Sequence, residues 1–326
     1  MRTTGWGRRG SGGRCVAMAA AVAVLPMGLA ACGDDDDKDK STAAKATPLA
    51  ITTSDVGSKR FKTEAPKSIK GGLVNFTFTN AGKEDHEAQL ARIDGAHTSQ
   101  DVLELVGKED APIPDWVTFP GGAGSTAPGQ TVNATLNLRP GKYLMLDIGD
   151  PDAGPPPSTR GALAEFEVTA GEDGPLPAST ATITAATDEA AEEAAEEADE
   201  AAKGTDEHAK HEHSFEISGL KAGKNRVRFV NKGKELHHAV LFPILPGKTI
   251  ADVEKFFMQQ GRPTGPPPAD FENAVNTATV EGDTEQVADL VLAKPGKYAV
   301  VCFLTDRDGK GKPHFAEGML EEADVK

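Results

Sequence analysis

The segment Pro295-Gly296-Lys297-Tyr298-Ala299-Val300-Val301-Cys302 predicts a β-strand that ends at a cysteine. Its proline and glycine favour a tight turn, and the alternation that follows places Tyr298 and Cys302 on one face of the strand. His314 and Met319 follow in the sequence. A thiolate, an imidazole and a weak thioether are ligands of a blue-copper centre, which also needs a second histidine. The alternative is that Cys302 is a small buried apolar residue unrelated to the other two.

The same pattern occurs twice in the chain. Residues 80–90 (NAGKEDHEAQL) match residues 231–241 (NKGKELHHAVL) without a gap, and residues 140–143 (PGKY) match residues 295–298 (PGKY). The two matches have the same order and a similar separation. We therefore predict that one module of about 120 residues has been duplicated.

Short segments of alternating apolar and polar residues recur in both modules and are typical of half-buried antiparallel strands. They lie at residues 73–79, 88–93, 131–138, 225–230, 239–244 and 286–292. Residues 101–107 and 250–260 are predicted to be helices. The sequence thus predicts an all-β chain of two tandem Greek-key β-sandwiches with short helical insertions.

The first 31 residues are typical of an export signal. Their beginning is basic, and the apolar run from Val16 to Leu29 is too short to span a membrane. The run ends in Leu29-Ala30-Ala31-Cys32, which resembles the lipobox of bacterial lipoproteins. That resemblance implies cleavage before Cys32 and lipid attachment to it, whereas the alternative is an ordinary signal peptide. Residues 32–47 are predicted to be a disordered tether, so we expect a cell-membrane protein that is lipid-anchored on the extracytoplasmic side.

The three cysteines strengthen the ligand hypothesis. Cys15 leaves with the signal and Cys32 is consumed by lipid, so Cys302 is the only free thiol of the mature chain. A free thiol outside the cytoplasm is prone to oxidation unless it is buried or bound to a metal. The net charge of −15 at pH 7 argues against nucleic acid as a partner and favours cationic partners.

The second module, about residues 210–326, resembles the cupredoxins, the plastocyanin-like blue-copper family. The segment from Val230 to His237 is similar to the one that bears the first histidine ligand of the family. Residues 296–302 match the family pattern G-x-Y-x-x-x-C, and residues 314–319 match its H-x4-M ending. The resemblance implies one type 1 copper per chain. Its ligands would be His237, Cys302 and His314, with Met319 as the long axial ligand.

Two features leave alternatives open at this site. His238 competes with His237, but the repeat pairs His237 with His86 and pairs His238 with Glu87. Neighbouring strand residues also point to opposite faces, so we favour His237. Eleven residues separate Cys302 from His314, more than is usual in the family. We expect this polar insert to bulge outward, with a loosened site or a partner-binding loop as alternatives.

The first module lacks the set of ligands. Asp147 stands at the position of the cysteine, Ala162 stands near that of the methionine, and of the histidines only His86 remains. A hard carboxylate without a second imidazole is a poor copper site. We expect residues 48–170 to form a degenerate cupredoxin-like domain without metal, which serves as a spacer or docking surface.

Residues 171–213 are predicted to be a linker with an Ala/Glu-rich insertion, ahead of a copper-binding domain at residues 214–326. The insertion at residues 187–203 has an N-cap candidate in Thr187 but no apolar stripe, so we expect it to be exposed and partly helical or disordered. Three histidines at its end could bind metal loosely, although a solvated polar segment is the favoured interpretation. They are His208, His211 and His213.

The resemblance implies an electron carrier that passes single electrons between redox partners, which the sequence does not identify. We expect the edge of His314 to face such a partner. No phosphate-binding loop, catalytic triad or zinc-protease motif is found in the sequence, so we do not expect an enzyme. The alternatives are a copper-sequestering or copper-delivery lipoprotein, and a metal-free structural or binding sandwich.

Overall fold

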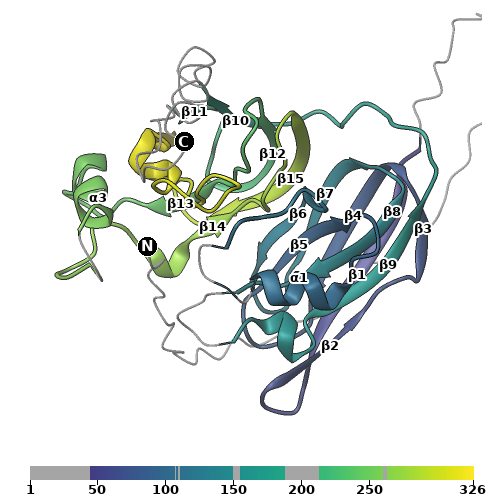
Figure 1. Cartoon of the computed structure of the whole chain (residues 1–326). Coiled ribbons are helices and arrows are strands. Elements are labelled where there is room, and N and C mark those ends of the chain that lie inside the picture. The colour runs from purple at the N-terminus through teal and green to yellow at the C-terminus, as the bar shows by residue number, and fades with distance from the viewer. Residues whose placement is uncertain (1–44, 107, 109–110, 150–154, 188–212, 260–262) are drawn as a thin grey trace, which may run out of the picture.

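The computed structural model describes residues 45–106, 108, 111–149, 155–187, 213–259 and 263–326 (Figure 1). Their strands form two β-sandwiches that lie side by side. We call β1 to β9 the first sandwich and β10 to β17 the second sandwich. The predicted signal segment, Cys32, the tether up to residue 44 and the insertion with His208 and His211 lie outside the described residues.

The first sandwich has two sheets that enclose an apolar core containing Phe76, Phe78 and Tyr143. One sheet has the order β2 (Arg60–Glu64), β1 (Thr47–Val56), β4 (Gly72–Asn80) and β7 (Thr131–Leu138). The other has the order β3 (Ser68–Lys70), β9 (Leu163–Thr169), β8 (Gly141–Leu146), β5 (His86–Ile93) and β6 (Val117–Thr126). Helix α1 (Ser99–Val106) and the 3-10 turn η2 (Pro157–Arg160) lie in the connections.

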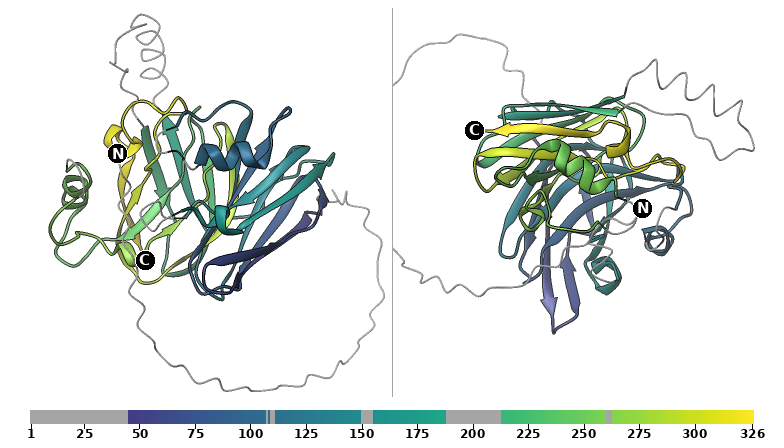
Figure 2. Two further views of the ribbon diagram at one scale, coloured as in Figure 1. Left: turned by 60° about the horizontal axis from the view of Figure 1, so that its bottom comes forward. Right: turned by 90° about the vertical axis from the view of Figure 1, so that its left-hand side faces the viewer.

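The second sandwich repeats this plan. One sheet has the order β11 (His213–Ser218), β10 (Ala181–Thr187), β12 (Gly223–Asn231) and β15 (Thr284–Leu292). The other has the order β14 (Val275–Asn276), β13 (Val240–Pro243), β16 (Gly296–Val301) and β17 (Leu320–Val325). Helix α3 (Ile250–Phe257) and the 3-10 turns η3 (Phe271–Asn273) and η4 (His314–Glu317) complete it. Helix α3 projects at one side of this sandwich (Figure 2) and begins at a capping box of Thr249 and Asp252.

The predicted all-β architecture of two tandem sandwiches with short helical insertions is confirmed, but the second sandwich begins earlier than expected. Strand β10 lies within the segment predicted to be a linker, and Thr187 ends this strand instead of capping a helix. The strand pairs in parallel with β12, just as β1 pairs in parallel with β4. Side chains alternate between the two faces of β10, and Ile183 points into the core. Strand β10 therefore belongs to the sheet of the second sandwich.

One continuous sheet joins the two sandwiches. Strands β7 and β15 pair antiparallel, with Ala134 opposite Ala288, and the joined sheet contains eight strands among the described residues. Leu138 pairs with the glycine that starts β4, and Leu292 pairs with the glycine that starts β12. Ala134 lies four residues before Leu138, and Ala288 lies four residues before Leu292. The two alanines therefore occupy equivalent positions in the two modules. The duplicated modules therefore meet about a local twofold axis.

Close backbone approach strengthens this junction. A Cβ atom added to Gly122 of β6 would lie 3.1 Å from the Cβ of Ala278, and one added to Gly124 would lie 2.3 Å from the carbonyl of Asn276. The side chain of Gln89 donates to the carbonyl of Thr279 at 3.1 Å and accepts from its amide at 2.7 Å. Such contacts need glycine and a buried amide side chain, and they fix the two sandwiches against each other.

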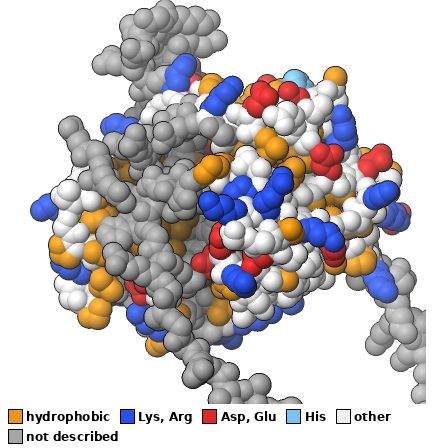
Figure 3. Space-filling model, turned by 90° about the horizontal axis from the view of Figure 1, so that it is seen from below, with side chains coloured by type: hydrophobic (Ala, Val, Ile, Leu, Met, Phe, Trp, Pro, Cys, Tyr) orange, Lys and Arg blue, Asp and Glu red, His pale blue; other side chains and the backbone are white. Residues whose placement is uncertain are grey.

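No helix in the described part of the chain has the length and apolar character needed to cross a bilayer. On the face drawn in Figure 3, basic and acidic side chains lie among hydrophobic ones.

Candidate metal centre

Cys302 lies directly after β16 and is fully buried. Its amide donates to the carbonyl of Met319 at 3.2 Å, and its own carbonyl accepts from Phe315 at 3.0 Å. The amide of His314 donates to the carbonyl of Leu304 at 2.8 Å. These bonds close the base of the long loop between the cysteine and the histidine. The insert therefore does not separate Cys302 from His314.

Three of the four predicted ligands bring their donor atoms together. The Sγ atom of Cys302 lies 3.8 Å from Nδ1 of His237 and 3.6 Å from Nδ1 of His314, and the two nitrogens are 3.1 Å apart. All three side chains have an exposed fraction of 0%. Met319 is also fully buried and belongs to the same apolar cluster as Cys302.

His237 enters the site from a short bridge outside the regular strands. Its amide and carbonyl both bond to Val280, at 3.2 and 2.9 Å. The side-chain amide of Asn231 holds the preceding turn by donating to the carbonyls of Glu235 and Val280. His238 points elsewhere, because its Nε2 accepts a hydrogen bond from the amide of Phe303 at 3.1 Å. The structure thus turns His237, and not His238, toward the cysteine.

The donor set fits a first-row transition metal. Metal–nitrogen bonds of about 2.0 Å and metal–sulfur bonds of about 2.3 Å place neighbouring donors of a trigonal or tetrahedral site roughly 3 to 4 Å apart. The separations among His237, His314 and Cys302 lie within that range. Two imidazoles with one thiolate and a thioether nearby are suited to copper.

The pKa values of the histidines reflect their burial and their closeness to one another and to other polar groups. Burial, followed by the charge of His314, lowers the pKa of His237 well below its usual value. Burial likewise lowers the pKa of His238 to about 4. For His314 burial also lowers the pKa, but hydrogen bonds with Asp306 and Cys302 outweigh it and raise the pKa to about 10. Without metal, the raised pKa of His314 favours its doubly protonated, positively charged form, whereas His237 and His238 stay neutral.

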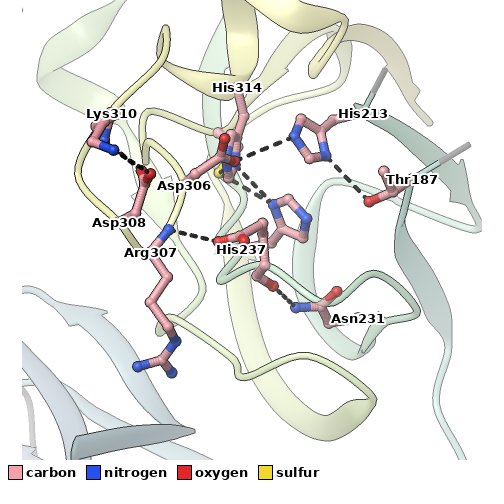
Figure 4. A network of polar contacts seen from close by, with 11 residues as sticks. Thr187, His213, Asn231, His237, Asp306, Arg307, Asp308, Lys310 and His314 are labelled. Carbon is pink, nitrogen blue, oxygen red and sulfur yellow. Dashed lines mark hydrogen bonds and ion pairs between the residues drawn. The ribbon is translucent and has the colours of Figure 1, made fainter. Parts of the chain in front are cut away.

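The outer edge of His314 is covered, contrary to expectation. Its Nε2 donates to Oδ1 of Asp306 at 3.2 Å, and the ring of His213 lies over it with the centroids 4.2 Å apart (Figure 4). His213 in turn shares a hydrogen bond with Thr187, at 3.2 Å between Nδ1 and Oγ1. His314 therefore does not present an edge at the surface for a partner.

Sequence reasoning missed both covering residues. Asp306 lies in the insert that we expected to bulge outward. His213 was assigned to a solvated approach, yet it is buried as the first residue of β11. The pairing of Thr187 with His213 joins β10 to β11 across the insertion. The strand-like alternation of residues 181–187 could have indicated β10. The pairing of β10 with β11 is what places His213 at the site.

No protein-family model matches the sequence, and no curated protein matches it. Among solved structures, the chain is similar to reduced auracyanin from Roseiflexus castenholzii, at 17% identity and a TM-score of 0.27 over 37% of this chain and 96% of that chain. It is also similar to a copper nitrite reductase from Nitrosomonas europaea, at 16% identity and a TM-score of 0.23 over 86% of this chain and 94% of that chain. A multicopper oxidase matches at 16% identity and a TM-score of 0.21, over 86% of this chain and 88% of the other.

Both sandwiches have a cupredoxin-like fold. The repeated strand order, with its parallel pairs β1–β4 and β10–β12, and the order of the four site residues in the second sandwich carry this assignment. The expected fold and the resemblance to cupredoxins are thus confirmed.

The cupredoxin-like first sandwich has a hydrogen-bonded pair at the equivalent position. Nδ1 of His86 lies 2.5 Å from Oδ2 of Asp147, both side chains are buried, and Phe61 packs edge-on against the imidazole. Burial raises the pKa of Asp147, and the bond to His86 partly offsets that rise. Among the described residues of this sandwich, no third side chain completes a metal-ligating group.

Proposed function

We propose that this protein is a membrane-anchored, extracytoplasmic type 1 copper protein that carries single electrons between redox partners. The observation that supports the proposal is the convergence of one sulfur and two imidazole nitrogens within 3.8 Å of one another in a buried pocket.

The residues suit that task. A copper ion held here would supply one-electron chemistry between its cuprous and cupric states. His237 and His314 offer Nδ1, Cys302 offers its sulfur, and Met319 is the candidate axial ligand. The backbone bonds at Cys302, His314 and Met319 restrain the donors, so little rearrangement is needed when the charge of the site changes. Complete burial of these side chains excludes water, and four protein ligands leave no open position for a substrate.

The anchor and the partners are the less direct parts of the proposal. The lipobox-like sequence before Cys32 supports lipid attachment, which would hold the protein at the membrane surface. The acidic net charge favours cationic redox proteins and disfavours nucleic acid. Replacing Cys32 with alanine should release the protein from membranes into the soluble fraction. An unchanged membrane fraction would contradict the anchor.

The copper-loaded protein tests the central proposal. We expect an intense visible sulfur-to-copper band, a matching EPR spectrum, and reversible one-electron cycling without loss of metal. The variant Cys302→Ser should lose the band. A colourless copper complex, or a band that survives in Cys302→Ser, would contradict the proposal. Because nitrite reductase and multicopper oxidase are among the similar structures, turnover of nitrite or oxygen should also be measured. Turnover would make the protein an enzyme.

Copper handling is the second candidate, and one observation favours it. His213, Asp306 and His314 form a second group whose ligand atoms all lie within 4.8 Å of one another. A protein that stores or delivers copper would use such a group to bind more metal or to pass it on. Metal analysis separates the candidates. An electron carrier binds one copper per chain that is retained in His213→Ala, whereas a handling protein binds more, or loses most of its copper in that variant.

A further inference from the structure

The loop between Cys302 and His314 connects the candidate metal centre to the first sandwich. We call residues 305–312 the strap. Within it, Asp306 contacts the metal-ligand candidate His314 (Figure 4). The next residue, Arg307, contacts the carbonyl of Ile113 in the other sandwich. These two neighbouring side chains serve two different parts of the molecule.

The attachment of Arg307 to the first sandwich is extensive. Its Nη1 lies 3.3 Å from the carbonyl of Ile113 and 3.2 Å from the carbonyls of Pro114 and Val117. Its backbone carbonyl accepts from the amide of Ile113 at 2.7 Å. A guanidinium has donors in a fixed planar arrangement, so several carbonyls at once hold it in one orientation.

The second sandwich completes this attachment. Glu281 pairs with the guanidinium of Arg307 and also accepts from the amide of Phe119 at 2.9 Å, which adds a contact between the sandwiches. The amide of Arg307 donates to Glu235 at 2.6 Å. Arg307 is mostly buried, with 21% of its side chain exposed, so these ionic contacts are only partly screened by water.

Asp306 has the geometry of a partner that orients a metal-binding imidazole. It accepts from Nε2 of His314, which leaves Nδ1 free to face Cys302 and His237. A carboxylate in this position fixes the tautomer and the ring orientation of the histidine and makes it a stronger base. Its negative charge also favours the more positive state of a bound ion.

We propose that the strap is a positioning device through which the first sandwich sets the hydrogen bonding of His314 and thereby the redox properties of the centre. This inference rests on the proposed function, because it concerns the same copper site. It gives the first sandwich a role. Asp306 and Arg307 act through His314 and are positioning residues.

Charge-matched substitutions within the strap test the proposal. Asp306→Asn should weaken the binding of cupric relative to cuprous copper by about tenfold. That corresponds to a one-electron reduction potential raised by about 59 mV. Asp308→Asn is the control, because Asp308 contacts Lys310 within the same strap. We expect no change of potential in the control. An equal rise in both variants, or a rise in neither, would overturn the role of Asp306.

The role of the first sandwich is tested through Arg307. Arg307→Ala should raise the potential in the same direction as Asp306→Asn, although removal of a positive charge alone would lower it. Lys310→Ala is the control with the same charge change, and it should show no rise. In the double variant Asp306→Asn/Arg307→Ala the potential should rise no further than in Asp306→Asn, because both residues act through one hydrogen bond. A rise from Arg307→Ala that persists in the Asp306→Asn background would overturn the proposed coupling.

Two further measurements keep the test decisive. If Arg307→Ala does not fold, Arg307→Lys keeps the charge but removes the planar donors that hold three carbonyls, and it should give a smaller rise of the same sign. NMR of the metal-free protein should show the Nε2 proton of His314 protected from exchange, and Asp306→Asn should reduce that protection. Wild-type protein without the sulfur-to-copper band would refute the proposed function. Wild-type protein with the band and with strap variants of unchanged potential would refute only this inference.

Discussion

At the scale of single residues, backbone hydrogen bonds at Cys302, His237 and His314 hold three buried donors close together, and Asp306 and His213 cover them. The cysteine at the end of a predicted strand and the match of His86 with His237 indicated residues whose donor atoms lie within 3.8 Å of one another in the structure. Asp306 and His213 escaped prediction because they stand in polar segments that look like solvated turns. Their places depend on closure of a long loop and on strand pairing across an insertion, which local patterns do not show.

The two neighbouring histidines give the first prediction. His237→Ala should abolish the visible copper band, because it removes one of the three converging donors. His238→Ala should keep the band and lower the free energy of unfolding by about 1 to 2 kcal/mol, because the amide of Phe303 loses its acceptor. Absorption spectra and urea unfolding measure the two effects. Loss of the band in His238→Ala alone would reverse the assignment of the ligand.

Glu87 gives a prediction about pH. Burial, followed by the charge of Asp147, raises the pKa of Glu87 from 4.5 to about 7, while its bond to Asn276 opposes the rise. Between these pH values the unfolded chain has lost a proton that the folded protein keeps, so stability falls as pH rises through this window. Glu87→Gln can still accept from Asn276 and cannot ionise. It should therefore be more stable than wild type by about 3 kcal/mol at pH 8 and nearly equal at pH 4.

Urea unfolding at several pH values checks this expectation. The exposed Glu216→Gln serves as the control, since it removes the same charge elsewhere on the chain. A difference between Glu87→Gln and wild type that stays constant with pH would mean that Glu87 ionises alike in the folded and unfolded states.

At the scale of elements, alternation and the repeat predicted most strands, because their side chains divide between a core and a surface. Strand β10 was assigned to a linker since it precedes a long Ala/Glu-rich insertion, which separates it from its hairpin partner β11. The beginning of β11 then packs against η4, and this contact depends on Gly318. At φ 111° this residue ends η4, and a Cβ atom there would lie 2.4 Å from the carbonyl of His213.

Gly318→Ala should therefore be costly. It would strain a backbone that favours glycine and would push β11 and His213 away from the centre. Gly265 has a φ of 95° with no atom within 4 Å of an added Cβ, so Gly265→Ala reports the backbone strain alone. We expect Gly318→Ala to be less stable than Gly265→Ala by about 2 kcal/mol, and its copper spectrum to change. Equal stabilities in urea unfolding would show that β11 moves aside without cost.

At the scale of the whole molecule, the repeat predicted two modules but not how they join. The continuous sheet needs β7 and β15 to pair at their edges, and the small side chains of Ala134 and Ala288 give no signal of this in the sequence. Buried polar contacts complete the junction. Gln286 is fully buried and accepts from the amide of Gly122 at 2.9 Å. These contacts and the shared sheet hold the two sandwiches together.

We therefore expect the two sandwiches to unfold together. Scanning calorimetry should show one transition whose calorimetric and van't Hoff enthalpies agree. Gln286→Ala leaves the amide of Gly122 without its acceptor and should lower the midpoint of that single transition, at a cost of about 1 to 3 kcal/mol. The exposed Gln130→Ala is the control and should leave the midpoint unchanged. Two resolved transitions, of which Gln286→Ala shifts only one, would show that the joined sheet does not couple the sandwiches.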